Sequence, residues 1–265
     1  MAAVDRLAVQ LRTAGAEDRA LLVLYLTYAP DCSPVELALA AIEAGADILE
    51  LGIPTPSARP RGAEMRGSYE RARGSSTEEA WEVFHQVREA APQTPLLPLV
   101  YPETVADLGW DAMLNEAAAA GADGVVLTRP WHDDGLEKVA SSGLSAVPVI
   151  PVSAGPAEVA RAEASAAHLT YRALLDRTGD QLELGSAQRL ARGLASTATK
   201  PFLVGFGVSS AREVSALAPH AAGVVVGSEL IRVIRTSAVG DRPKALAAAV
   251  RSWKSAAGAP RAKEL

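Results

Sequence analysis

The sequence contains a single cysteine, Cys32, among 265 residues. One cysteine excludes a disulfide within the chain, and the lack of any Cys-x-x-Cys pair or His/Cys metal spacing excludes the common zinc motifs. We therefore expect a reducing compartment. Because no basic neighbour activates it, Cys32 is expected to be a buried, inert thiol rather than a nucleophile.

Long apolar runs and an excess of positive charge are also lacking. No stretch approaches the roughly 18 uninterrupted apolar residues of a membrane span, and the N-terminus lacks the apolar run of a signal peptide. The net charge of −5 argues against a nucleic-acid partner. These absences predict a cytoplasmic protein with no membrane or nucleic-acid partner, and nothing in the sequence requires a metal or a cofactor.

The sequence does contain a repeated alternation of apolar runs and amphipathic stretches. Such alternation is typical of parallel strands covered by helices. The expected strands are Leu21–Tyr28, Asp47–Gly52, Leu96–Tyr101, Gly124–Thr128, Ala146–Val152, His168–Leu174, Pro201–Phe206 and Gly223–Gly227. The expected helices are Ala2–Ala14, Pro34–Ala44, Thr77–Ala91, Val105–Ala120, Gly135–Ser142, Ala157–Ala164, Ser186–Ser196, Ala211–Leu217, Leu230–Ile234 and Lys244–Ser255.

Eight strand–helix units in a chain of this length favour an α/β fold of the (β/α)8 TIM-barrel type. We expect one domain over residues 1–265, with an extra N-terminal helix within residues 1–16 and a frayed tail at 256–265. A doubly wound Rossmann sheet fits less well, because no G-x-G-x-x-G follows the first strand. The tetrapeptide Ala-Gly-Ala-Asp, at 44–47 and again at 120–123, supports repeated units.

Two apolar runs near the C-terminal end stop at glycine and then open a helical pattern. Glycine lets the backbone approach a ligand closely, and the first N–H groups of a helix have no partners within the helix. Two such turns after the last two strands predict a phosphate cradle. Its residues would be Gly205, Phe206, Gly207, Gly227 and Ser228. The ligand would be a phosphorylated small molecule.

Glu50 is a carboxylate inside the otherwise apolar run of the second expected strand. Active sites of (β/α)8 barrels lie at the carboxyl ends of the strands. Glu50 could instead face a helix and be satisfied by a neighbour. Burial of an unpaired carboxylate is costly, however, and functional sites tolerate that cost most often. Burial would also raise the pKa of Glu50 toward neutrality, as a general acid/base requires.

These motifs together resemble the tryptophan synthase α-subunit family. The resemblance runs over most of the chain and rests on the following segments: Thr27, Glu50–Pro54, Tyr101, Leu175–Gly179, Gly205–Ser210 and Gly227-Ser228. It implies a TIM barrel and a lyase of tryptophan or indole metabolism. The reaction would be the retro-aldol cleavage of indole-3-glycerol phosphate to indole and glyceraldehyde 3-phosphate. Glu50 would move protons at the indole C3 and the glycerol hydroxyl.

The resemblance also implies which residues bind the substrate. The phosphate would be held at Gly207, Gly227 and Ser228, with help from Gly179 in the loop after the sixth strand. The positions that match the indole pocket are Tyr25, Leu99, Tyr101, Val125 and Phe206. Their side chains would form flat apolar walls around a bicyclic ring.

The loop after the second expected strand departs from the family pattern. The family's second catalytic aspartate falls on Arg61, and another aspartate of this loop falls on Ser57. A guanidinium stays protonated, so it cannot accept the indole N–H, and beside Glu50 it would lower the pKa of that carboxyl. An aspartate that the family uses against its β subunit is Thr128 here, next to Arg129. These departures argue against a β-subunit partner.

The segment Ala58–Gly74 carries five arginines and permits two interpretations. It could be a solvated, mobile lid, or Arg61 or Arg59 could reach inward to bind a second anionic group. Glu64 could replace the missing carboxylate. Three functions therefore stay open: a lyase acting on indole-3-glycerol phosphate, a diverged enzyme acting on another phosphorylated or diphosphorylated substrate, and a non-catalytic binding relative.

Overall fold

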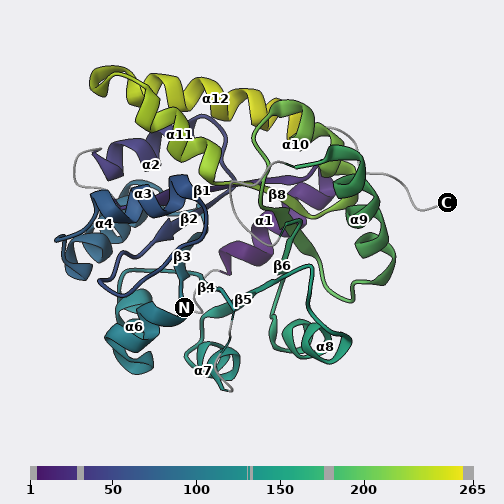
Figure 1. Cartoon of the computed structure of the whole chain (residues 1–265), viewed down its shortest axis with the longest axis horizontal. Coiled ribbons are helices and arrows are strands. Elements are labelled where there is room, and N and C mark those ends of the chain that lie inside the picture. Colours follow the sequence, from purple (N-terminus) through teal and green to yellow (C-terminus); the bar gives the residue numbers. More distant parts are fainter. Residues whose placement is uncertain (1–4, 29–32, 130, 132–133, 176–181, 259–265) are drawn as a thin grey trace.

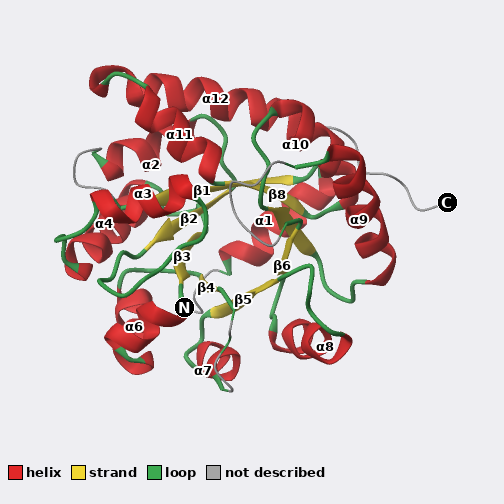
Figure 2. Cartoon of the chain, viewed as in Figure 1, coloured by secondary structure: helices red, strands yellow, loops and turns green. Residues whose placement is uncertain are grey.

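The structure, a computed structural model, describes residues 5–28, 33–129, 131, 134–175 and 182–258. Eight parallel strands close into a barrel in chain order, with β1 paired to β8 (Figure 2). The strands are β1 Leu21–Thr27, β2 Ile48–Gly52, β3 Leu96–Val100, β4 Gly124–Leu127, β5 Ser145–Ile150, β6 Thr170–Ala173, β7 Phe202–Gly205 and β8 Gly223–Val226. The predicted (β/α)8 TIM barrel is confirmed.

Helices surround the strands on the outside of the barrel (Figure 1). The α-helices are α1 Arg6–Ala16, α2 Pro34–Glu43, α3 Ala63–Arg71, α4 Thr77–Ala90, α5 Pro102–Leu108, α6 Trp110–Ala119, α7 Gly135–Ser141, α8 Pro156–Ser165, α9 Leu184–Thr197, α10 Ala211–Leu217, α11 Ser228–Thr236 and α12 Arg242–Ala257. Helix α1 is the expected extra N-terminal helix. Helix α12 extends to Ala257, so it includes two residues of the expected tail; Gly258 follows the helix, and residues 259–265 lie outside the described residues.

The apolar side chains form two separate cores, because successive residues of a strand point to opposite sides of the barrel wall. On β1, Leu21, Val23 and Tyr25 belong to the core inside the barrel. Leu22, Leu24 and Leu26 belong to the larger core between the strands and the helices. Leu7 and Ala14 of α1 join the inner core, so this helix closes the interior.

The repeated Ala-Gly-Ala-Asp segments end in buried aspartates that tie each strand to its neighbour. Asp47 precedes β2 and accepts a hydrogen bond from the Leu22 N–H of β1 at 2.7 Å. Asp123 precedes β4 and accepts one from the Leu96 N–H of β3 at 2.8 Å. Each carboxylate is also paired with cations: Asp47 with Lys254 and Arg19, Asp123 with Arg88 and Arg6. The repeat is thus structural.

The arginine-rich segment differs from the expected mobile lid, because residues 63–71 form helix α3. Met65, Ser68 and Tyr69 are buried on one face of this helix, and the charged residues lie on the other. The Ser68 hydroxyl lies 2.9 Å from the Thr27 hydroxyl of β1. Burial and this contact fix α3 against the barrel.

The expected helix Val105–Ala120 is two helices in the structure, α5 and α6, which meet at Gly109. Gly109 has a φ of +79°, a conformation that breaks a right-handed helix and that glycine adopts without strain. Among the described residues, no helix is long and apolar enough to span a bilayer.

The aspartate ties give a stability prediction. Asp123→Ala removes the acceptor of the Leu96 N–H and the counter-charge of two arginines at a site where the carboxylate is 6% exposed. We expect a loss of about 3 kcal/mol in the free energy of unfolding, measured by urea denaturation, because the Leu96 N–H stays without its acceptor and the part-buried Arg88 keeps only carbonyl acceptors. Glu17→Ala, which removes an exposed ion pair with Arg19, should change it by less than about 0.5 kcal/mol. Equal losses in the two variants would contradict this assignment.

Candidate active site

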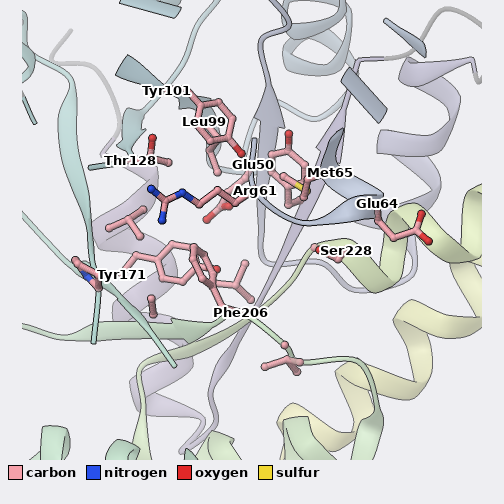
Figure 3. Close-up of a pocket in the computed structure, with 18 of the residues that line it drawn as sticks. Glu50, Arg61, Glu64, Met65, Leu99, Tyr101, Thr128, Tyr171, Phe206 and Ser228 are labelled. Carbon is pink, nitrogen blue, oxygen red and sulfur yellow. The ribbon is translucent and has the colours of Figure 1, made fainter. Parts of the chain in front are cut away.

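A cavity of about 1310 Å³ opens at the carboxyl ends of the strands. It is larger than a typical small-molecule pocket of roughly 300–1,000 Å³. Figure 3 shows the side chains that project into it. The residues that line it include Tyr25, Glu50, Arg59, Arg61, Glu64, Met65, Leu99, Tyr101, Thr128, Val149, Tyr171, Phe206, Gly207, Val225, Gly227 and Ser228. Most of the predicted site residues therefore meet in one space.

Glu50 lies on the inner face of the barrel wall, where its Cα pairs in register with Tyr25 of β1 and Leu97 of β3. It is 1% exposed, and its Oε1 atom has no hydrogen-bond partner among the described residues. Ile48, two residues earlier on the strand, belongs to the apolar core inside the barrel. The alternative that Glu50 faces a helix is therefore wrong.

Burial raises the pKa of Glu50 from 4.5 to about 8. Loss of hydration disfavours the charged carboxylate. The lowering of this pKa that we expected from Arg61 is not seen, since burial alone accounts for the shift. At neutral pH Glu50 is mainly a protonated acid that faces the cavity, which suits a group that first donates a proton.

Aromatic side chains form the walls around Glu50. Tyr25, Leu99, Tyr101 and Phe206 line the cavity, as the sequence predicted. The Tyr25 hydroxyl accepts a hydrogen bond from Thr27 at 2.9 Å, which fixes its ring. Sequence analysis missed Met65, Val149, Tyr171 and Val225, which also line the cavity. Residues two apart on a strand point to the same side of the barrel wall, so Tyr171 and Val149 point inward as Leu169 and Val147 do. This alternation could have identified both residues from the sequence.

Val125 was expected in the substrate pocket, and this expectation is wrong. Val125 belongs to the core between the strands and the helices, whereas Val126 belongs to the core inside the barrel. Adjacent residues of a strand point to opposite faces, so a shift of one residue moves a side chain from the interior to the helix layer.

The turn after β8 presents an open helix N-terminus to the cavity. Helix α11 begins at Ser228, and no side chain caps it at Gly227. Its first N–H groups therefore lack partners within the helix and favour an anion. The turn after β7 lies beside it, where Phe206 and Gly207 have φ values of +73° and +81°. A left-handed phenylalanine costs roughly 1–3 kcal/mol and is typical of functional sites.

The N-terminus of α10, the helix that follows β7, is capped by side chains of its own first turn. The Glu213 carboxylate accepts hydrogen bonds from the N–H groups of Ser209 and Ser210 at 2.7 and 2.9 Å. These two donors precede the first residue of α10, Ala211, and are occupied by an acidic group of the chain itself. The two turns are therefore not equivalent, because the α11 turn has no side chain that caps it at Gly227.

Two predicted phosphate ligands, Gly205 and Gly179, are not shown at this turn. Gly205 ends β7, and a Cβ atom there would lie 2.2 Å from the Tyr171 hydroxyl. Gly205 is therefore needed for packing against Tyr171, and it is not among the described residues that line the cavity. Gly179 lies outside the described residues.

Arg61 and Arg59 both line the cavity, but their side chains differ. The Arg59 guanidinium donates to the carbonyls of Pro56 and Ala58 at 2.8 and 3.0 Å, so it is held by its own loop. The Arg61 side chain extends into the cavity, toward the side where Thr128 and Tyr171 are seen (Figure 3). The Thr128 hydroxyl donates to the Val100 carbonyl at 3.2 Å.

Glu64 is held at the edge of the cavity by a bidentate ion pair. Its oxygens accept hydrogen bonds from Arg235 of α11 at 3.0 and 2.9 Å. The Arg235 hydrogen bond lowers the pKa of Glu64. Because its pKa is lowered and its oxygens are hydrogen-bonded to a guanidinium, Glu64 is a poor replacement for the family's aspartate, at whose position this chain has Arg61.

The remaining polar candidates contribute no metal site. Among the described residues, no group of three His, Cys, Asp or Glu side chains could hold a metal ion. His168 pairs with Asp5 at 2.8 Å, and Asp5 caps α1, the helix that closes the barrel interior, so His168 has a structural role. Cys32 and His132 lie outside the described residues.

Comparison with known proteins agrees with the fold. A family model for the tryptophan synthase alpha chain matches residues 11–257. A tryptophan synthase alpha chain from Halorhodospira halophila is 31% identical over 264 residues, which cover 96% of each chain. One from Roseiflexus castenholzii is 32% identical over 88% of this chain and 91% of the relative. The solved tryptophan synthase subunit alpha from Legionella pneumophila has a TM-score of 0.84 at 24% identity, covering 96% of this chain and 98% of that one.

The raised pKa of Glu50 makes stability depend on pH. The unfolded chain loses this proton near pH 4.5 and the folded chain near pH 8. The folded state therefore binds more protons in this window, and the free energy of unfolding falls as pH rises through it, by a total on the order of 5 kcal/mol. Urea unfolding of wild type and Glu50→Gln at pH 5 to 8.5 should show the wild type losing stability relative to the variant. A flat or rising difference would contradict the raised pKa.

Proposed function

Because the chain belongs to the tryptophan synthase alpha chain family, we propose that it is a lyase that breaks a carbon–carbon bond in a phosphorylated substrate. The first candidate reaction is the retro-aldol cleavage of indole-3-glycerol phosphate to indole and glyceraldehyde 3-phosphate. The observation that carries this proposal is Glu50, a buried carboxyl group with an unpartnered oxygen in a cavity with an open helix N-terminus.

Glu50 supplies the proton transfers of this reaction. In its protonated form it donates to the indole C3, which makes the ring a cation. The resulting carboxylate takes the proton of the hydroxyl on the adjacent carbon, and that carbon becomes an aldehyde. The electron pair of the broken carbon–carbon bond returns to the ring and restores indole, and Glu50 is again protonated. A carboxyl group with a pKa of about 8 can serve in both directions near neutral pH.

The rest of the cavity positions the substrate on either side of Glu50. The phosphate binds at the N-terminus of α11, to the backbone at Gly227 and Ser228 with Gly207 beside it. The flat leaving group lies between the side chains of Leu99, Tyr101 and Phe206. The substrate carbon chain then runs past the Glu50 carboxyl.

A second candidate is an enzyme of the same kind with a different phosphorylated substrate. The observation that favours it is Arg61, whose side chain extends into the cavity where the family has an aspartate. An arginine cannot accept the indole N–H or stabilise a ring cation. The non-catalytic alternative is less favourable, because a binding protein gains nothing from a buried carboxyl group with one oxygen that lacks a partner among the described residues. We also propose that the protein works without a β subunit, because Thr128 stands where the family has an aspartate that contacts this subunit. Its location would be the cytoplasm.

The role of Glu50 is tested by a variant that keeps its size. Glu50→Gln should lower kcat/KM for indole release from indole-3-glycerol phosphate at least about 100-fold, because an amide cannot exchange the proton. Glu89→Gln removes an exposed carboxylate of α4 and should retain the wild-type rate. Indole release that is equal in Glu50→Gln and wild type would refute the assignment.

The phosphate site is tested by a charge at the start of α11. Ser228→Asp places a carboxylate where the phosphate would bind, and we expect affinity for glycerol 3-phosphate to fall about tenfold or more by calorimetry. An acidic residue in the first turn favours the helix, so the variant should remain folded. Ala157→Asp adds the same charge to the exposed first turn of α8 and should bind as wild type does. Undiminished binding by Ser228→Asp would place the phosphate elsewhere.

A further inference from the structure

The cavity has two polar ends with an aromatic middle. One end is the open N-terminus of α11 at Ser228. The Arg61 side chain reaches into the cavity from the loop between β2 and α3, and its guanidinium lies toward Thr128 and Tyr171, across the cavity from Ser228 (Figure 3). A ligand bound through a phosphate at Ser228 therefore meets a guanidinium at its other end.

The chemistry of Arg61 selects what that other end can carry. A guanidinium is always charged, donates hydrogen bonds and accepts none. The indole N–H is a donor, and a guanidinium gives it no acceptor. A carboxylate presents two coplanar acceptor oxygens that match the guanidinium fork. Arg61 thus leaves the N–H of a bare indole unpaired and favours an acidic group.

We propose that the substrate of this barrel is a phosphate ester whose leaving group carries a carboxylate that pairs with Arg61. This inference rests on the proposed function, because it takes the phosphate to bind at α11. The cavity volume of about 1310 Å³ accommodates a phosphate, an aromatic ring and an added carboxylate together.

Two further observations agree with this specificity. Arg59 donates hydrogen bonds to the carbonyls of Pro56 and Ala58 of its own loop, and the Arg61 side chain extends into the cavity (Figure 3). Glu50 is mainly neutral at pH 7, since burial raises its pKa to about 8. It therefore does not cancel the positive charge that Arg61 brings to the cavity.

The test uses uncleavable probes of matched length. We compare 3-phenylpropyl phosphonate with its ortho-, meta- and para-carboxyphenyl counterparts by calorimetry on the full chain at pH 7. In wild type, at least one carboxylated probe should bind about tenfold or more tightly than the plain probe, as expected of a bidentate charge-assisted pair. Arg61→Gln should abolish this gain, and Arg61→Asp should reverse it.

Arg73→Gln is the matched control, because Arg73 is an exposed arginine of the same segment and lies outside this cavity. It should keep the full gain. Phosphonates that bind wild type with equal affinity whether or not they carry a carboxylate would overturn the inference while leaving the proposed function intact. A gain that survives in Arg61→Gln would overturn it in the same way. If no phosphonate binds at all, the phosphate site of the proposed function fails, and the inference fails with it.

Discussion

The site depends on the alternation of side chains along a closed parallel barrel. In β2 this alternation turns Ile48 and Glu50 inward and Leu49 and Leu51 outward toward the helices. A carboxyl group is thereby held among apolar side chains, where its hydration is lost and its proton is retained to about pH 8. A register shift of one residue would place the same carboxyl in the helix layer and leave the cavity without an acid.

Around this acid, the loops decide which ligand the barrel accepts. The two helices after β7 and β8 begin side by side, yet Glu213 occupies the donors before α10 while α11 stays uncapped. The α11 turn therefore favours an anion more than the α10 turn does. Opposite it, the β2 loop contributes a cation where the family has an acid. In the proposed function, Glu50 on the barrel wall transfers the proton and Arg61 in the loop selects the ligand group.

Much of this could be predicted from the sequence. Apolar runs that alternate with amphipathic stretches located every strand, and Glu50 stood out as an isolated acid in one of them. The phase of β4 could not be predicted, because Gly124–Leu127 contains no polar residue to mark a face, and Val125 was misplaced for that reason. Helix α3 was not predicted, although Met65, Ser68, Tyr69 and Ala72 recur at helical spacing. The arginines of this segment indicated a charged loop instead. The left-handed conformation of Phe206 leaves no sequence signal, because only glycine announces such a backbone.

The Glu64–Arg235 ion pair has a consequence for the evolution of this barrel. Glu64 lies in the first turn of α3, three residues after Arg61, and its partner Arg235 lies in the last turn of α11, so the ion pair links these two helices. A transplanted segment that extends into α3 and lacks a carboxylate at position 64 would leave Arg235 without this partner. Such an exchange therefore needs a matching change at Arg235 to keep α3 and α11 compatible.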